Sequence, residues 1–466
     1  MPGDFTLPQL DERVLSTLNA DGSRRWIDPK AVRGPLHTAR AVVAWTLIAI
    51  FTVLPWLRID GKPPILLDVM TRHFTVFGTT FRPTETLLLA LLLLAVFVAV
   101  FLATAVLGRV WCGWGCPQTV YLEFVYRPLE RLVLGTGAAR SGSAATWRRI
   151  ALYALFLLIS AHLANTFLAY FVGTDRLVQW TLRSPAEHPA AFAVFAITTG
   201  LMMFDFVFFR EQLCTLVCPY GRFQSVLLDR DSMIVTYDPR RGEPRANAAE
   251  RKAMAAEGKA AGDCIECSWC QQVCPTGIDI RDGLQLECIH CTQCIDACNT
   301  VMEKVGKPKG LIRYSTQNRI EGLKGRVFRY RIAIYVAVLG ALVTALVLML
   351  DRRAQVLVEQ ARMIGVNFTE LPDGMVRSPV RLLLENRTEA EVWATVRATG
   401  DVQVEGGEAR AVIPALEALQ VDMAVLSPAS SFGRGSRSAT LRVETGAEFA
   451  RDVTVRLAGP FGGGPS

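Results

Sequence analysis

The sequence predicts a multi-pass membrane protein with two further parts, one rich in cysteine and one rich in β-strand. Three observations support this fold class. Of the 466 residues, 51% are hydrophobic, and they are concentrated in five long runs. All twelve cysteines lie between residues 112 and 298. From about residue 354 to 466, short runs with partial alternation and β-branched residues are separated by Gly, Pro and Asn, which is typical of a small β-sandwich.

Each apolar run is about as long as a helix must be to cross a bilayer. A helix needs roughly 20 apolar residues to span about 30 Å of hydrocarbon. The runs cover residues 38–57, 86–108, 150–172, 190–209 and 332–350. A long polar tail, residues 1–37, precedes the first run, and no small-residue cleavage site follows it. We therefore expect this run to stay as a membrane helix and not to be removed as a signal peptide.

The cysteines indicate an orientation. With the N-terminus inside the cell, the four helices within 38–209 return the chain to the cytoplasm, residues 210–331 form a long cytoplasmic loop, and the fifth helix carries residues 354–466 to the periplasm. All twelve cysteines then face the reducing cytosol, where thiols persist. Lys and Arg near the helix ends favour this orientation only weakly. The basic cluster from Lys324 to Arg331 predicts contact with anionic lipid, and no feature predicts nucleic-acid binding.

The most specific motif lies at about 255–305 and occurs twice. Both "CIECSWCQQVC" and "CIHCTQCIDAC" have the spacing Cys-x2-Cys-x2-Cys-x3-Cys. In bacterial two-cluster ferredoxins, the fourth cysteine of each such run binds the other cluster. We predict one 4Fe-4S cluster on Cys264, Cys267, Cys270 and Cys298 (cluster 1) and a second on Cys288, Cys291, Cys294 and Cys274 (cluster 2). Structural zinc sites are the alternative, but they usually have two-plus-two spacing.

Other polar residues near these motifs are weaker candidates. Asn299 stands where the first run has Pro275, which predicts a slightly looser turn. His290 is expected to be a loop residue near cluster sulfur and not a ligand, because four thiolates are already present. His162 is an ionisable residue within an apolar run and hence a functional suspect, but the other runs contain no second His to complete a haem site. Asp205 and Arg210 are expected to pair with each other.

The remaining cysteines form two Cys-x-x-x-Cys-Pro motifs, "CGWGCP" and "CTLVCP", after the second and fourth apolar runs. Helix positions i and i+4 share a face, so Cys112 with Cys116, and Cys214 with Cys218, could each chelate a soft ion or combine into one site. Thiolates favour copper(I), zinc and iron-sulfur units. Proline disfavours helix at the preceding cysteine, so each helix should break there. Inert buried cysteine is the alternative, but two matching pairs favour a metal or redox role.

Several stretches resemble the FixG/CcoG family of cytochrome c oxidase accessory proteins. They are "YDPRRGEPR" at 237–245, the ferredoxin block, "GLIRYST" at 310–316 and the paired Cys-Pro motifs. The resemblance implies a bacterial inner-membrane protein with an immunoglobulin-like periplasmic domain that reduces copper(II) to copper(I) for assembly of a cbb-type oxidase. It also implies copper handling by Cys112, Cys116, Cys214 and Cys218, and oxidase subunits or copper chaperones as partners. The electron donor and self-association stay open.

Three functions are compatible with these sequence features. The first is an iron-sulfur oxidoreductase that passes electrons to copper. The second is a quinol-linked membrane ferredoxin that feeds a periplasmic reductase, and the third is a non-catalytic scaffold for oxidase assembly. The C-terminal β-domain and the 237–245 stretch favour the first.

Overall fold

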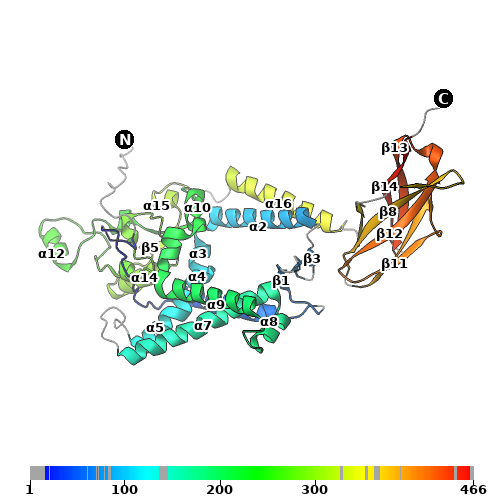
Figure 1. Cartoon of the computed structure of the whole chain (residues 1–466). Helices are drawn as coiled ribbons and strands as arrows, with labels where there is room; N and C mark the ends of the chain where they lie inside the picture. The colour runs from blue at the N-terminus through cyan, green and yellow to red at the C-terminus, as the bar shows by residue number, and fades with distance from the viewer. Residues whose placement is uncertain are drawn as a thin grey trace. The chain divides into compact units, whose positions relative to one another are not determined.

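The chain forms two compact units, Met1–Leu346 and Val347–Ser466 (Figure 1). This is a computed structural model, which describes residues 16–19, 21–59, 61–69, 71, 73–77, 79–81, 85–135, 145–325, 329–351, 355–361, 368–388, 390–445 and 449–461. Most of the polar tail, residues 1–15, and part of the basic cluster, residues 326–328, therefore lie outside the described residues.

Five helices of the described chain are long and apolar enough to cross a membrane, which confirms the five expected. They are α1 (Pro35–Val53) with its 3-10 extension η1 (Leu54–Trp56), α2 (Thr86–Leu107), α7 (Thr146–Val172), α9 (Pro189–Phe204) with the π-turn η4 (Asp205–Phe209), and α16 (Tyr330–Asp351). Most of their side chains are not buried inside the protein, as expected for helices that face lipid. α7 packs against α9, α5 (Arg127–Leu134) and α8 (Thr174–Thr181).

A small antiparallel sheet between α1 and α2 was not predicted. Its strands are β1 (Ile65–Asp68), β2 (His73–Val76) and β3 (Thr79–Phe81), in the order β1-β2-β3, and α7 packs against β1. Strands of three or four residues are too short for alternation to distinguish them from a loop.

The two apolar helices that precede the Cys-Pro motifs end in short, broken segments. After α2 come α3 (Val110–Trp114), α4 (Pro117–Tyr121), the π-turn η3 (Leu122–Tyr126) and α5 (Arg127–Leu134); after η4 come the π-turn η5 (Leu213–Val217) and α10 (Pro219–Leu227). Cys116 and Cys218 both have extended backbone, with ψ angles of 125° and 109°. The break predicted from the following proline is thus present in both motifs.

The cysteine-rich region is closed by a two-stranded antiparallel ribbon. β4 (Ile234–Tyr237) pairs with β5 (Ile312–Ser315), and between them lie α11 (Pro239–Gly242), α12 (Ala248–Ala256), α13 (Trp269–Gln272), the 3-10 turn η6 (Ile280–Asp282) and α14 (Gln293–Lys304), with α15 (Gln317–Ile320) after β5. We call residues 234–315 the ferredoxin module. Its core combines apolar side chains such as Val235, Ile295 and Met302 with the cysteines themselves.

Asn299 does not loosen a turn, which corrects the expectation from the missing proline. α14 continues through Asn299 to Lys304, because Asn keeps the backbone N–H that proline lacks. The Asn299 side chain also accepts a hydrogen bond from the backbone N–H of Gly310 at 2.9 Å.

The C-terminal unit is built from two antiparallel sheets around one core. Its strands are β6 (Val356–Ala361), β7 (Thr369–Glu370), β8 (Met375–Asn386), β9 (Val392–Thr399), β10 (Gln403–Val404), β11 (Ala409–Ile413), β12 (Ala418–Pro428), β13 (Arg434–Thr445) and β14 (Phe449–Phe461), with a 3-10 turn at Ala429–Ser431. One sheet has the order β10-β12-β8-β6, with β7 on β8, and the other has the order β11-β9-β13-β14. Side chains from both sheets, including Leu382 and Leu441, share the core. The β-rich region is therefore as predicted, and an immunoglobulin-like fold stays a prediction.

Candidate iron-sulfur and thiol site

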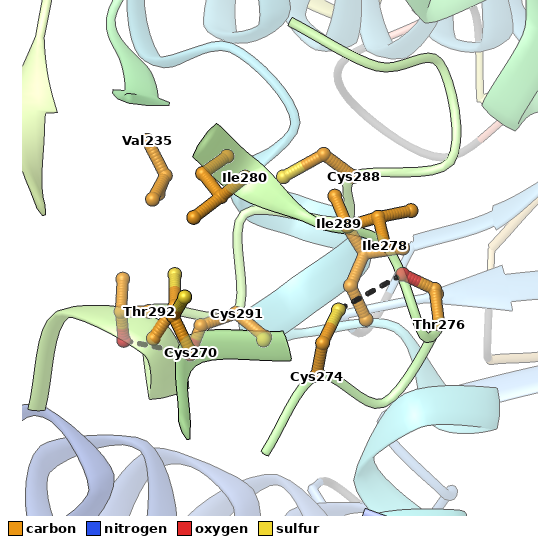
Figure 2. A pocket seen from close by; sticks show the side chains of 11 residues that line it. Val235, Cys270, Cys274, Thr276, Ile278, Ile280, Cys288, Ile289, Cys291 and Thr292 are labelled. Atoms are coloured by element: carbon orange, nitrogen blue, oxygen red, sulfur yellow. Dashed lines mark hydrogen bonds between the residues drawn. The ribbon is translucent and has the colours of Figure 1, made fainter. Parts of the chain in front are cut away.

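The ferredoxin module contains two cavities, and the cysteines divide between them. One cavity is lined by Cys264, Cys267, Cys270 and Cys298, the set predicted for cluster 1. The other is lined by Cys274, Cys288, Cys291 and Cys294, the set predicted for cluster 2, with Cys270 at its edge (Figure 2). Each cavity thus gathers three cysteines of one run and the last cysteine of the other, which is the exchange that the motif predicts.

Both runs shape their backbone in the same way. Left-handed φ angles occur two residues after the first cysteine, at Glu266 (55°) and His290 (53°), and one residue after the second, at Ser268 (52°) and Thr292 (65°). Backbone in such conformations turns successive N–H groups toward a common centre, as in many sites for iron-sulfur clusters and other anions. The equivalent turns therefore fit two equivalent clusters.

The cavity walls are apolar, which affects the thiols. Ile278, Ile280 and Val235 line the cluster 2 cavity beside Cys288 and Cys291 (Figure 2). Burial raises the pKa of Cys270, Cys288 and Cys291 to about 12 and that of Cys298 to about 11. Without a metal these groups are neutral thiols at pH 7, and a bound cluster would replace their protons, because thiolates are the ligands. Cys267 is the exposed member of the eight.

In the described part of the chain, no three His, Cys, Asp or Glu side chains converge on a single metal ion. A 4Fe-4S cluster makes a different demand, because each of its four irons takes one thiolate and the ligands surround a body of eight atoms. Two cavities in an apolar core, each lined by at least four cysteines, fit that demand.

The other four cysteines lie near one another, and we call them the four-thiol cluster (Cys112, Cys116, Cys214 and Cys218). The Cys112 thiol lies 3.1 Å from Oε1 of Gln224, to which it donates. Burial raises the pKa of Cys112 to about 11; Arg109 opposes this effect, while Cys116 and Cys218 add to it. Burial also raises the pKa of Cys214, and all three other thiols raise it further. The two motifs, separated by about a hundred residues, therefore come close to each other, although no three of these thiols converge on a single ion in the described chain.

The four-thiol cluster also contacts the ferredoxin module. Cys112 packs with Ile289 and Cys291, which carry the wall and one ligand of the cluster 2 cavity. The approach is so close that a Cβ atom on Gly113 would lie 2.5 Å from the Ile289 carbonyl oxygen and 2.9 Å from the backbone nitrogen of Cys291. Glycine is therefore required here, because a side chain would separate the two parts.

His290 contributes to the same contact from the module side. It does not line the cluster 2 cavity, and its Nδ1 accepts a hydrogen bond of 3.0 Å from the backbone N–H of Arg109. Burial and the charge of Arg109 lower the pKa of His290 to about 3, so the ring is neutral and its other nitrogen carries the proton. Tyr314 donates to the His290 carbonyl oxygen at 2.9 Å.

A buried ionic network joins the segment after the first Cys-Pro motif to the segment before the second. Arg127, at 2% exposure, pairs with Glu123 and with Glu211, the latter at 3.1 Å. Glu123 also accepts a hydrogen bond of 2.9 Å from Gln293, the residue before Cys294. Arg24 completes the network at 3.3 Å from Glu211. One network thus ties both motifs to the module.

The expected pairing of Asp205 with Arg210 was wrong. Arg210 pairs with Glu130 at 2.9 Å, and Asp205 accepts a hydrogen bond of 3.2 Å from Gln118. The cause is local, because the π-turn η4 ends at Phe209 and Arg210 takes a left-handed φ of 51°. His162 lies exposed on α7 and lines neither cavity.

Sequence reasoning missed several residues of the site. Arg40 of α1 is fully buried and donates from Nε to the Gly113 carbonyl oxygen at 2.8 Å. Arg109 and Gln224 lie between the four-thiol cluster and the module. A charged residue inside an apolar run is a visible signal, and Arg40 has it; nothing in the local pattern marks Gln224.

The chain is similar to known iron-sulfur proteins. A family model described as a 4Fe-4S dicluster domain matches residues 209–317, and one described as a 4Fe-4S binding domain matches residues 89–134, which include Cys112 and Cys116. These matches support two iron-sulfur clusters and a function in electron transfer.

Three relatives match over most of the chain. The nitrogen fixation protein FixG of Rhizobium meliloti is 36% identical over 67% of this chain, which spans 62% of that protein's length. Protein RdxB of Cereibacter sphaeroides is 33% identical over 85% of this chain and 87% of its own length. Protein RdxA of the same organism is 32% identical over 77% of this chain and 79% of its own length. This chain therefore belongs to the FixG family.

Proposed function

We propose that this protein is a membrane iron-sulfur oxidoreductase that reduces copper(II) at the four-thiol cluster during assembly of a cbb-type cytochrome c oxidase. In this proposal Cys264, Cys267, Cys270 and Cys298 hold cluster 1, and Cys288, Cys291, Cys294 and Cys274 hold cluster 2. Copper is the substrate, and Cys112, Cys116, Cys214 and Cys218 bind it.

One observation carries the proposal: the contact of Cys112 with Ile289 and Cys291. It brings the thiols best suited to a soft ion against a ligand of the cluster 2 cavity. It also supports a common side of the membrane for the four-thiol cluster and the module, because two groups in contact cannot lie across a bilayer. All twelve cysteines then share one compartment, which supports a cytoplasmic module and a periplasmic C-terminal domain.

The residues of the four-thiol cluster suit copper reduction. When bound, each 4Fe-4S cluster exchanges one electron, which is the number that converts copper(II) to copper(I). An external one-electron reductant supplies that electron, and dithionite takes this part in an assay. Copper(I) is the softer ion and is preferred by thiolates, so binding favours the reduced product. The bound thiols lose their protons to solvent, and the Arg109 guanidinium beside Cys112 offsets the negative charge that remains.

The test uses the purified full-length protein with both clusters in place. We expect eight irons per chain, stoichiometric copper binding, and release of copper(I) to a specific chelator after reduction by dithionite. Cys214→Ser with Cys218→Ser should abolish copper binding and keep eight irons. The matched control, Cys274→Ser with Cys294→Ser, should lose the iron of cluster 2 and copper reduction while copper(I) binding persists.

Each failure has a different meaning. Copper binding that survives the Cys214/Cys218 change would disprove the copper site. Twelve irons per chain would assign the four-thiol cluster to a third iron-sulfur cluster, a candidate that the 89–134 match favours. Zinc in place of iron would refute the whole proposal. In cells, oxidase assembly should fail with the Cys274/Cys294 variant; normal assembly would favour a scaffold.

A further inference from the structure

Arg40 brings a positive charge to the cluster 2 region, and no carboxylate of the described chain forms an ion pair with it, although it lies close enough to Glu123 to lower the pKa of that carboxyl. Its side chain is 0% exposed, and among the described residues both of its Nη atoms lack a hydrogen-bond partner. Its one hydrogen bond joins Nε to the Gly113 carbonyl oxygen, and its guanidinium lies 5.3 Å from the Phe124 ring. The neighbouring carboxylate of Glu123 is already paired with Arg127.

Arg109 brings a second such charge from another segment. It is 3% exposed, its Nε lies 3.4 Å from Gln224 Oε1, and its Nη1 donates to the Leu286 carbonyl oxygen. No Asp or Glu of the described chain forms an ion pair with Arg109 or Arg40. A buried cation costs several kcal/mol unless an anion compensates it, so each site requires negative charge from another source.

The cluster 2 cysteines are the groups on which both charges act. Arg40 donates to the carbonyl oxygen of Gly113, which lies against the backbone of Cys291, and Arg109 donates to the carbonyl oxygen of Leu286, two residues before Cys288. The cluster 1 cavity differs, because its arginine, Arg281, pairs with Asp279 and adds little net charge. The two cavities are therefore alike in ligands and unlike in charge.

We propose that Arg40 and Arg109 are positioning residues that supply the compensating charge of cluster 2 and raise its reduction potential above that of cluster 1. The inference rests on the cluster assignment in the proposed function. Reduction adds negative charge to a cluster, so a fixed positive charge stabilises the reduced form more than the oxidised form. Electrons then reside preferentially at the cavity that contacts the four-thiol cluster, while Cys267 of cluster 1 provides the exposed edge for their entry.

The test measures midpoint potentials by paramagnetic resonance during a redox titration, without copper. Arg40→Gln and Arg109→Gln remove the charge, Arg40→Lys and Arg109→Lys retain it, and Cys294→Ala identifies the cluster 2 signal by its loss. Each Gln variant should lower the cluster 2 midpoint by at least a tenfold change in equilibrium, about 59 mV for one electron. The Lys variants should restore most of the shift, and cluster 1 should stay unchanged.

Arg131→Gln is the matched control, since Arg131 donates to the Pro29 carbonyl oxygen and neither cavity includes it. Gln variants that keep eight irons and wild-type midpoints would overturn the proposal, as would Lys variants that shift as far as the Gln variants. The Gln variants could also lose iron. In that case, Lys variants that keep eight irons and near wild-type midpoints would support the proposal that the positive charge matters. Lys variants that also lose iron would refute it. Because copper is absent, failure of copper reduction leaves this result intact.

Discussion

Gly113→Ala should separate the four-thiol cluster from the ferredoxin module without removing a ligand from either. The new Cβ would lie 2.5 Å from the Ile289 carbonyl oxygen and 2.9 Å from both the nitrogen and the Cα of Cys291. All three are backbone atoms, so no rotamer change can relieve the clash. Ordinary van der Waals contact begins at 3.4 Å, whereas the new Cβ would lie 2.5 Å from the Ile289 oxygen. The α3 segment and the loop at Ile289 must therefore move apart by about 0.9 Å.

Two effects oppose each other in this variant. Overpacking of this kind costs about 1–3 kcal/mol, while Ala in place of Gly favours a helix by about 1 kcal/mol at most. α3 has only five residues, so the steric cost should dominate. Electron transfer becomes slower as donor and acceptor move apart, so we expect copper reduction to be slower in Gly113→Ala.

The assay mixes dithionite-reduced protein with copper(II) and follows the iron-sulfur absorbance in a single turnover. Gly113→Ala should keep eight irons and full copper(I) binding, so that only the rate changes. Gly200→Ala on α9 is the control, because a Cβ there meets nothing within 4 Å. A wild-type rate in Gly113→Ala would show that the contact between Cys112 and the module is not needed for electron delivery.

Three further results follow from buried polar groups. Arg127→Met removes the ion-pair partner of Glu123 and leaves Glu211 with Arg24, and it should destabilise the protein by about 3–5 kcal/mol, seen as a lower denaturation midpoint. Burial raises the pKa of Glu123, but the charge of Arg127 outweighs this effect, so the pKa of Glu123 in the folded protein is below 4.5. Ionised Glu123 should therefore stabilise the folded protein fully above about pH 4.5, and this stabilisation should be lost as the pH falls below that value. Glu123→Gln should remove this acid dependence. Asn386 is fully buried and donates to the carbonyl oxygens of residues 390, 413 and 414, so Asn386→Ala should cost about 1–3 kcal/mol and raise hydrogen exchange in β8 and β11 alone.

Local patterns were sufficient for the features that depend on neighbours in the sequence. The division of eight cysteines between two cavities follows from spacings of three and four residues, and the extended backbone at Cys116 and Cys218 follows from the next residue being proline. The five apolar helices follow from composition and length alone. The spacing within each cysteine run, the proline breaks and the apolar helices are all set by nearby residues.

Features set by distant partners could not be predicted in the same way. Arg210 seemed to have a partner in Asp205, but Glu130, 80 residues away, takes that place. The contact of Arg109 with His290 spans 181 residues, and that of Arg40 with Gly113 spans 73. No periodicity encodes such pairs, because packing of whole elements decides which side chains meet.

Arg40 is visible in the sequence as a charge inside an apolar run, but the sequence does not indicate what the charge does. An arginine near the start of an apolar helix commonly extends toward the lipid headgroups and keeps its charge in water, and the sequence does not exclude this. The structure instead buries it completely against the Gly113 carbonyl oxygen. A buried cation is costly unless an anion lies near it. The thiolates that would hold cluster 2 in the neighbouring cavity carry the negative charge that Arg40 needs. We therefore predict that exchange of the first apolar helix for another membrane anchor changes the potential of cluster 2.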